Sequence, residues 1–464
     1  METTICAIAT PAGSGGIAII RVSGSRAYEI CNGIFRPAEK NIASLTDMPS
    51  HTIHFGQIMA DSNTMIDEVL LSIFRAPHSF TGEDVVEINC HGSVFIQQEI
   101  LKLLVQNGCT MAQPGEFTKR AFANGRMDLS QAEAVADLIA AQSKAAHRIA
   151  LHQMRGGFSS ELSLLRDQLL HLNTLVELEL DFSEEDVAFA DRAKLMELTT
   201  TIRTHIERLE RSFATGNAIK QGIPVAIVGE TNAGKSTLLN LLLHEERAIV
   251  SDVHGTTRDT IEDTVNINGV LFRFIDTAGL RQTDNAIENI GIKRTYEMIE
   301  KADIILWTID CTQVSEHIDW LAEHILSHAI GKKTLLVFNK TDKINDEERE
   351  ALDALFAPYR AERLYISAKQ RIHTDQLEQR IYAAAQLPDI ADNETIVANI
   401  RHHEALLHAR TAIERVQNGL KEQLSGDLLA EDIRACLHYL GEITGQITTE
   451  DTLNNIFKNF CIGK

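Results

Sequence analysis

A glycine-bounded segment at residues 229–236 has the residue types and the spacing of a phosphate-binding loop. It reads GETNAGKS and fits the pattern GxxxxGK[ST], in which backbone N–H groups and the following helix N-terminus face an anion. Lys235 can reach the outer phosphates of a nucleotide, and the Ser236 hydroxyl can take a place on Mg²⁺. The runs 225–228 and 237–243 predict the buried strand and the helix that position this loop.

A second group of residues suits the metal and the γ-phosphate. Residues 271–275 predict a strand that ends at Asp276, whose carboxylate can hold the Mg²⁺ shell. The N–H of Gly279 can meet the γ-phosphate. Between these residues and the phosphate loop, Thr257 can close over the metal as a first switch.

A third group of residues suits a guanine base. Residues 334–338 predict a strand that leads into Asn339-Lys-Thr-Asp342, and Asp342 can accept the ring N–H and the exocyclic amine of guanine, a pair that adenine lacks. A buried acceptor left unpaired costs roughly 1–3 kcal/mol, so this position discriminates strongly. Residues 367–369 read Ser-Ala-Lys, which resembles the base-supporting loop of GTPases.

These segments follow one another in the order of a GTP site, with strands alternating with helical patterns as a doubly wound sheet requires. The residues predicted to contact GTP are Asn232, Ala233, Gly234, Lys235, Ser236, Thr237, Ser251, Asp252, Val253, His254, Gly255, Thr256, Thr257, Asp276, Thr277, Ala278, Gly279, Asn339, Lys340, Asp342, Ser367, Ala368 and Lys369.

The residue after Gly279 departs from a common GTPase pattern. Many GTPases carry a Gln there that orients the attacking water, whereas this chain has Leu280, which has no hydrogen-bonding group. Asn232 and the polar residues 251–256 offer oxygen ligands for a monovalent cation that could stand in for an arginine finger. Asp284 or Glu288 could hold the water, although both also suit solvated loop positions.

Composition limits the class of protein. The chain has 464 residues, which is too long for one core, and its 65 acidic against 44 basic residues give a formal net charge of −21. That balance argues against a protein that grips nucleic acid mainly through a basic face. Its 7 cysteines form no CxxC pair and no zinc spacing, and no apolar run approaches the length of a membrane span. We expect a cytoplasmic protein with reduced thiols and no membrane segment.

Pattern changes divide the chain into four segments. Residues 1–120 alternate short β-like runs with Gly and Pro turns and suit a small α+β domain, and residues 121–216 read as long helices. Residues 217–383 carry the GTPase motifs, and helical periodicity returns over 384–464. This arrangement predicts an α/β multidomain protein in which one helical domain is interrupted by an inserted Ras-like P-loop GTPase domain.

The chain resembles the MnmE (TrmE) family of tRNA-modification GTPases along its whole length. The resemblance rests on the GTPase motifs and on several blocks outside them, of which the terminal FCIGK is among the most specific. Those blocks are Thr10-Pro11 with Gly15-Gly16, RVSG at 21–24, FTGEDVVE at 80–87, His91-Gly92, PGEFTKRAF at 114–122, DLSQAE at 128–133 and FCIGK at 460–464.

The resemblance implies that the N-terminal domain is similar to folate-binding domains of one-carbon enzymes and pairs two subunits into a homodimer. By position, its contacts to 5-formyl- or methylene-tetrahydrofolate would be Arg21, Glu87, Arg126 and Lys464. A carboxylate such as Glu87 can bind the amide-like edge of a pterin, while the glutamate tail of folate suits a cation. Without the family, Glu87 also reads as a charge on a strand face and Arg21 as a salt-bridged surface residue.

The resemblance also implies a potassium-stimulated GTPase mechanism. Its K⁺ ligands would be Asn232, Ser251, Val253 and Thr256, its Mg²⁺ ligands Ser236 and Thr257, and its water-orienting carboxylate Glu288. The implied partner is a flavoprotein of the MnmG (GidA) type, which carries the FAD and joins the homodimer in a larger complex that acts on tRNA.

Two interpretations of the role of Cys461 are open. A thiol near a helical C-terminus, flanked by Lys458 and Lys464, could have a lowered pKa and act as a nucleophile or base. Cysteine is equally a common small buried hydrophobe.

The interpretation that follows is a GTPase that modifies C5 of the wobble uridine of certain tRNAs with a carboxymethylaminomethyl or aminomethyl group. The alternatives are a ribosome-assembly or regulatory GTPase of the Era-like class, and a folate-dependent one-carbon transferase that the GTPase regulates. The sequence does not determine the tRNA set, the amine donor, the oxidation state of the folate, the extent of GTPase-domain motion or whether Cys461 touches substrate.

Overall fold

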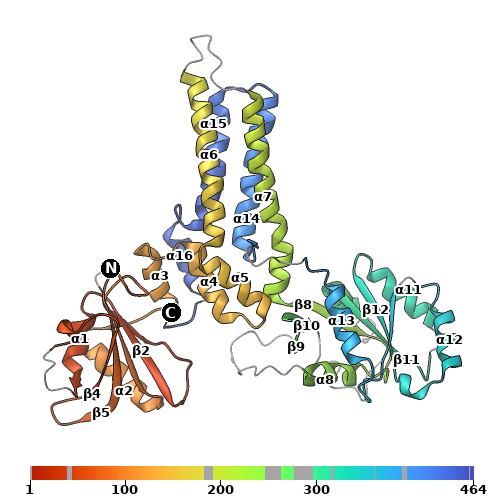
Figure 1. The fold of residues 1–464 in the computed structure, drawn as a ribbon, viewed down its shortest axis with the longest axis horizontal. Helices are drawn as coiled ribbons and strands as arrows, with labels where there is room; N and C mark the ends of the chain where they lie inside the picture. Colours follow the sequence, from red (N-terminus) through yellow and green to blue (C-terminus); the bar gives the residue numbers. More distant parts are fainter. Residues whose placement is uncertain are drawn as a thin grey trace. The chain divides into compact units, whose positions relative to one another are not determined.

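The structure is a computed structural model that describes residues 3–38, 44–181, 192–245, 263–275, 296–314, 318–359, 361–388, 394–458 and 460–463. The chain forms two compact units (Figure 1). The first comprises Met1–Ala140, Leu151–His205 and Ala405–Lys464, and the second comprises Ala141–Ala150 and Ile206–Glu404.

The first unit begins with a 7-stranded sheet in the order β3-β4-β5-β6-β2-β1-β7. All neighbouring pairs are antiparallel except β1 and β7, which run parallel. The strands are β1 Ile5–Ile8, β2 Ile17–Ser23, β3 Phe35–Pro37, β4 Thr52–Met59, β5 Met65–Phe74, β6 Val85–His91 and β7 Thr110–Met111, and the helices that accompany them are α1 Ala27–Ile34, η1 Leu45–Asp47 and α2 Val94–Gln106.

Strand alternation separates the two faces of this sheet. Ile20, Val22 and Ile88 belong to the core that includes buried residues of α1 and α2. On the opposite face Ile5, Ala7 and Phe117 form a second, smaller core. The sheet is therefore covered from two sides near β1 and β2.

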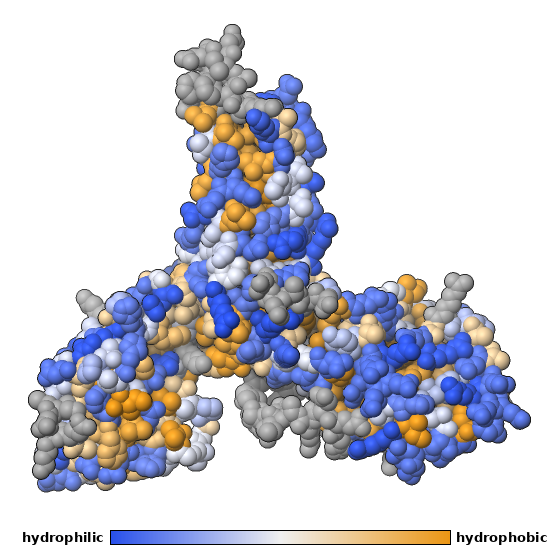
Figure 2. Space-filling model, in the orientation of Figure 1, coloured by the Kyte–Doolittle hydropathy of each residue, from blue (hydrophilic) through white to orange (hydrophobic). Residues whose placement is uncertain are grey.

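The other part of that second face stays open along β4 and β5. Phe55 on β4 pairs with Leu70 on β5, and they remain 52% and 47% exposed, while Ile53 is 65% exposed. Figure 2 shows apolar residues gathered on this domain and along the helical bundle, on a surface that is otherwise largely hydrophilic.

Helices from both ends of the chain build the rest of the first unit. Helix α6 packs against α15, and Gln417 Nε2 on α14 donates to Thr200 Oγ1 on α7 at 3.1 Å. Because these partners lie on opposite sides of the GTPase segment in sequence, that segment is an insertion in a helical domain (Figure 1). The helices of this region are α3 Glu116–Ala123, α4 Leu129–Ala140, α5 Lys144–Met154, α6 Gly157–Asp181, α7 Arg192–Gln221, α14 Ile400–Lys421, α15 Gly426–Thr444 and α16 Glu450–Phe457. Of these, residues 144–150, 206–221 and 400–404 belong to the second unit.

The second unit contains a 6-stranded sheet in the order β13-β12-β11-β8-β10-β9. Its pairs are parallel except that of β9 with β10. The elements are β8 Ile223–Val228, α8 Lys235–Glu245, β9 Asp263–Ile267, β10 Val270–Phe274, β11 Ile304–Asp310, α11 Ile318–His328, β12 Lys333–Asn339, η2 Thr341–Lys343, α12 Asp346–Leu355, β13 Glu362–Tyr365 and α13 Thr374–Ala384.

Helices cover both faces of this sheet. One core joins α8 and α13 to β8 through residues such as Leu238, Leu377 and Val225. The other core joins α11 and α12 to the opposite face through Ile325, Leu352 and Trp307. The doubly wound sheet and the fold class predicted from the sequence are confirmed. Among the described helices, none has the length and apolar composition that crossing a membrane requires.

Candidate functional site

The phosphate loop connects β8 to α8, and two glycines fit it closely against its neighbours. Gly229 has φ of +142°, and a Cβ there would lie 2.1 Å from the Thr308 carbonyl oxygen on β11. Gly234 has φ of +93°, and a Cβ there would lie 2.1 Å from the Asn339 side-chain nitrogen. Side chains are excluded at both positions, so the backbone of the loop stays open to an anion at the start of α8.

Lys235 is the first residue of α8 and bridges its own loop. Its Nζ donates to the carbonyl oxygens of Gly229 at 2.8 Å and Glu230 at 2.7 Å. Burial lowers the pKa of the Lys235 ammonium, and the nearby Glu230 carboxylate opposes that shift. A phosphate oxygen would replace neutral carbonyl partners with a charged one, which strengthens the hydrogen bonds of this ammonium.

Asn339, at the end of β12, joins the phosphate loop to the base-binding segments. Its Nδ2 donates to the Ala233 carbonyl at 2.9 Å, and its Oδ1 accepts from the N–H groups of Lys340 at 2.9 Å and Ala368 at 3.0 Å. The side chain is buried, at 2% exposure. Three segments far apart in sequence therefore meet at one amide.

Lys340 makes a second link to the same loop. Its Nζ donates to the Asn232 carbonyl at 2.9 Å and forms an ion pair with Asp310 at the end of β11. Asn232 has φ of +65°, a left-handed conformation that Asn tolerates better than most residues. Two consecutive carbonyls of the loop, those of Asn232 and Ala233, are thus held by the two residues that precede Thr341.

The base-side residues occupy one edge of the sheet. Asp342 lies exposed in η2, and the neighbouring Thr341 N–H donates to the Ile366 carbonyl at 3.1 Å. Ser367 and Ala368 are buried, whereas Lys369 is exposed. Asp342 and Lys369 can therefore reach a base beside the phosphate loop.

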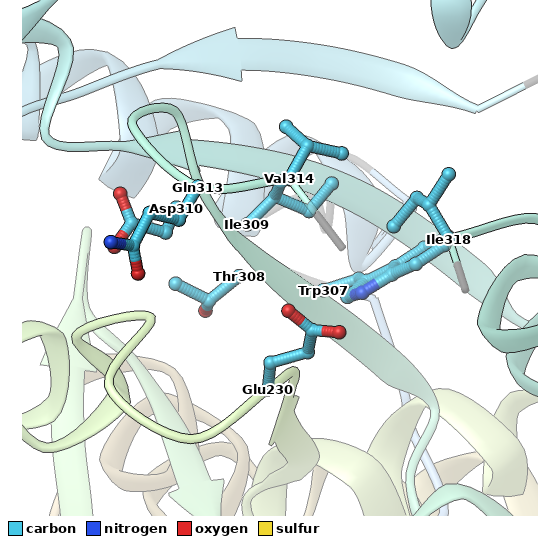
Figure 3. Close-up of a pocket in the computed structure, with 8 residues that line it drawn as sticks. All are labelled: Glu230, Trp307, Thr308, Ile309, Asp310, Gln313, Val314 and Ile318. Atoms are coloured by element: carbon cyan, nitrogen blue, oxygen red, sulfur yellow. The ribbon is translucent and has the colours of Figure 1, made fainter. Parts of the chain in front are cut away.

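A small pocket lies on another side of the loop (Figure 3). It contains Glu230 and Asp310, whose carboxylates would repel nucleotide phosphates, and the buried Thr308 hydroxyl, which has no hydrogen-bond partner among the described residues. Its lining is formed by Glu230, Trp307, Thr308, Ile309, Asp310, Gln313, Val314 and Ile318.

Arg21 and Glu87 form an ion pair across adjacent strands of the N-terminal sheet. They are register partners on β2 and β6, and the Arg21 Nε and Nη2 atoms both lie 2.8 Å from Glu87 Oε1. Their side chains are 16% and 20% exposed. Among the residues that the structure describes, none donates a hydrogen bond to Glu87 Oε2.

Two aromatic rings and the C-terminal segment surround the Arg21 guanidinium. Its Cζ lies 5.5 Å from the centre of the Phe80 ring and 5.6 Å from that of Phe117. Its Nη1 donates to the Gly463 carbonyl at 3.3 Å. The C-terminal segment at Gly463 therefore lies beside the Arg21–Glu87 pair.

Cys461 is exposed, whereas the other six cysteines are buried. Its carbonyl accepts from the Gly115 N–H at 3.3 Å, which anchors the segment at the start of α3. Gly463 has φ of +97°, and a Cβ there would lie 2.2 Å from the Ile8 carbonyl oxygen. Arg126 is exposed and packs beside Gly82, where a Cβ would lie 3.2 Å from Arg126 Cγ.

Comparisons with known proteins agree over the full chain. A family model described as the MnmE helical domain matches residues 129–461, and one described as GTP-binding protein TrmE N-terminus matches residues 4–126. A protein named tRNA modification GTPase MnmE from Bacteroides fragilis is 56% identical over 466 residues, covering 100% of this chain and 100% of its own. The chain belongs to the MnmE family of tRNA modification GTPases.

Further relatives are similar. A protein of the same name from Bacteroides thetaiotaomicron is 54% identical over 466 residues, with 100% of both chains covered. A solved structure of Aquifex aeolicus Era bound to GDP and aluminium fluoride matches 41% of this chain and 66% of its own, with 28% identity and a TM-score of 0.28.

Several residues predicted for the site of this MnmE family member lie outside the described residues. They include both switch segments and the last residue of the chain: Ser251, Asp252, Val253, His254, Gly255, Thr256, Thr257, Asp276, Thr277, Ala278, Gly279, Leu280, Asp284, Glu288 and Lys464. Their roles stay predictions.

Two features of the sites were not predicted from the sequence. Asp310 pairs with Lys340, and the only local signal for it is an acidic residue at the end of an apolar strand. Arg120 is 1% exposed beneath the Arg21 site and bonds Glu83 and Glu116, although an Arg on a short polar helix is ordinarily expected at the surface.

Proposed function

We propose that this chain is a GTPase that works with a flavin-binding partner resembling MnmG to modify C5 of the wobble uridine of certain tRNAs. The group added is of the aminomethyl or carboxymethylaminomethyl type, and its methylene carbon comes from 5-formyl- or methylene-tetrahydrofolate. Family membership supports the tRNA substrate, because the full-length relatives are named tRNA modification GTPases. The observation that supports the GTPase part of the proposal is the Asn339 amide, which holds the phosphate loop and the base-binding loop together.

GTP binding uses groups that already converge. Lys235 exchanges the carbonyls of Gly229 and Glu230 for phosphate oxygens, and Ser236 at the helix start supplies a hydroxyl to Mg²⁺. Asp342 accepts the two donors of the guanine edge. Mg²⁺ when bound neutralises charge that develops on the phosphates, with Thr257 as its second protein ligand.

Hydrolysis requires a water-positioning group, since Leu280 has none. We assign this role to Glu288, which can accept a hydrogen bond from the attacking water. A potassium ion would take oxygen ligands from Asn232, Ser251, Val253 and Thr256. The Asn232 carbonyl is held by the Lys340 ammonium, so the amide oxygen of its side chain would be the ligand.

The one-carbon carrier would lie beside the Arg21–Glu87 pair. A carboxylate oxygen of Glu87 suits the N–H edge of a pterin, and the exposed Arg126 suits the carboxylates of the glutamate tail, as Lys464 would. Arg21 holds Glu87 and the Gly463 carbonyl, which keeps Cys461 next to the same place. Cys461 is exposed enough to reach a substrate.

A homodimer would form through the N-terminal domain. The open face of β4 and β5 presents Ile53, Phe55 and Leu70, an apolar surface that a second copy would bury. GTP turnover would then change the relative positions of the domains and would not itself drive bond formation at uridine. A GTPase domain inserted in a helical domain suits this role.

The test is reconstitution. The purified chain, a flavoprotein partner of the MnmG type with its FAD, tRNA with an unmodified wobble uridine, methylene-tetrahydrofolate, an ammonium source and GTP are combined in a buffer with Mg²⁺ and K⁺. The tRNA nucleosides are then measured by mass spectrometry. We expect 5-aminomethyluridine only when all components are present and GTP is hydrolysable. Product formed equally well with a non-hydrolysable GTP analogue, or no product from the complete mixture, would contradict the proposal.

A further inference from the structure

A buried charge cluster lies next to the Arg21–Glu87 pair in the first unit. Its centre is Arg120 on α3, whose Nη1 donates to the Thr3 carbonyl at 2.7 Å and to Glu83 Oε2 at 3.2 Å. Its Nη2 donates to Glu116 Oε1 at 3.0 Å and to Thr3 Oγ1 at 3.1 Å. Arg120 is 1% exposed, and Glu83 is 14% exposed.

Glu83 extends this cluster to β2 and to the loop before β6. Ser23 Oγ donates to Glu83 Oε2 at 2.8 Å and lies 2.8 Å from Thr81 Oγ1. Ser23 and Thr81 are both fully buried. The Arg120 guanidinium and the Glu83 carboxylate therefore connect α3, β2 and the segment around residue 81 through hydrogen bonds and ion pairs.

Each connected segment carries one of the groups around Arg21. Ser23 lies two residues after Arg21 on the same side of β2, Phe80 precedes Thr81, and Phe117 lies one turn before Arg120 on α3. These are the two rings that flank the Arg21 guanidinium. A shift of any one of these segments would therefore move Arg21 or one of the two rings that flank it.

Stability alone does not account for this arrangement. Removing the Arg120 guanidinium from water and Glu83 and Glu116 partly from water is costly, and well-packed apolar side chains of similar volume often serve a core equally well. A hydrogen-bonded ion pair fixes the direction of the contact, because each hydrogen bond sets the position of its partner. An apolar contact does not fix a direction. The geometry thus favours a role in placement.

We propose that Arg120 and Glu83 are positioning residues of the one-carbon carrier site, acting through Ser23, Phe80 and Phe117 on Arg21 and Glu87. The pair fixes the walls between which a pterin edge meets Glu87, and it touches neither the carrier nor GTP. This inference rests on the proposed function, because it takes the tetrahydrofolate site beside Arg21 as given.

The first variant is Glu83→Gln, which keeps the shape and one acceptor but removes the charge that orients Arg120. The matched control is Asp67→Asn, because Asp67 is also a nearly buried carboxylate of this sheet, paired with His91, and is not among the groups around Arg21. Affinity for 5-formyl-tetrahydrofolate is measured by calorimetry on the full-length protein, with thermal melting and the GTP hydrolysis rate measured in parallel.

We expect Glu83→Gln to weaken 5-formyl-tetrahydrofolate binding about 12-fold, the lower end of the range for a hydrogen bond to a charged group. GTP hydrolysis should stay unchanged, and Asp67→Asn should bind the ligand as the wild type does. Should Glu83→Gln not fold, Ser23→Ala removes the hydrogen bond that links β2 to the Glu83 carboxylate. It should weaken binding about 5-fold, less than Glu83→Gln does, because Arg120 keeps its own hydrogen bond to Glu83.

Three outcomes separate the explanations. Wild-type affinity in a folded Glu83→Gln or Ser23→Ala protein would overturn the positioning role. Equal weakening by Glu83→Gln and Asp67→Asn would also overturn it, because general destabilisation would then explain both. If the wild type binds no 5-formyl-tetrahydrofolate, the carrier site itself is refuted, and the positioning role with it.

Discussion

The Asn339 amide offers the sharpest test of how the GTP site is assembled. In Asn339→Asp the side chain keeps its shape, and one carboxylate oxygen still accepts from the N–H groups of Lys340 and Ala368. The other oxygen faces the Ala233 carbonyl, where the amide now donates at 2.9 Å. A donor is replaced by an acceptor at one contact, and a negative charge enters a buried position, which adds to the cost of the lost hydrogen bond.

The cost follows from burial. Asn339 is 2% exposed, so the Ala233 carbonyl would lose its partner away from water, at about 1–3 kcal/mol. Because Ala233 belongs to the phosphate loop, this loss falls on the conformation that binds nucleotide. Converted at 1.4 kcal/mol for each factor of ten, it predicts binding of GDP weakened about 5-fold to about 150-fold.

The assay is titration with a fluorescent GDP analogue, with Asn345→Asp as the matched control. Asn345 caps α12 by accepting from the Glu348 N–H at 2.9 Å, a role that Asp fills equally well, so this control should bind GDP as the wild type does. An Asn339→Asp protein that binds within twofold of the wild type would refute the view that this amide holds the two loops together.

Three further experiments, two of them substitutions, test other parts of the protein. Asp342→Asn should shift nucleotide preference from GTP towards xanthosine triphosphate, measured by competition, and unchanged GTP selectivity would remove the basis for guanine recognition. Asn232→Lys places an ammonium at the proposed cation position. It should abolish stimulation of hydrolysis by K⁺ over Na⁺, while GTP affinity changes less than about threefold. If the variant still hydrolyses GTP faster in K⁺ than in Na⁺, the K⁺ assignment is wrong. Because Cys461 is exposed and the other six cysteines are buried, iodoacetamide should modify it first, and peptide mapping that finds another cysteine equally reactive would contradict the seating of the C-terminal segment.

The local parts of the fold were predictable because their signals are contiguous. The strand at 223–228, the glycine-bounded turn and the helix from Lys235 follow one another within about two dozen residues, and apolar periodicity reports each of them. The insertion of the GTPase domain was predictable for a similar reason, since helical periodicity stops before the GTPase motifs and resumes after them.

The contacts that join distant segments were not predictable in the same way. Asn339 was expected to serve the base, but its partners Ala233 and Ala368 lie 106 and 29 positions away, and no local pattern encodes those distances. Arg21 and Glu87 were each predicted for the carrier site, yet their mutual ion pair follows from strand register, which the sequence leaves undetermined.

The central claim is that this chain acts in modification of wobble uridines, and the most direct measurement is a mass-spectrometric inventory of tRNA nucleosides from cells that lack it. The account predicts loss of the 5-aminomethyl-type uridines, restored by the intact gene and not by a Lys235→Ala copy, whose phosphate loop lacks its ammonium. An unchanged inventory in the deleted cells would contradict the account and bring a ribosome-assembly role to the front.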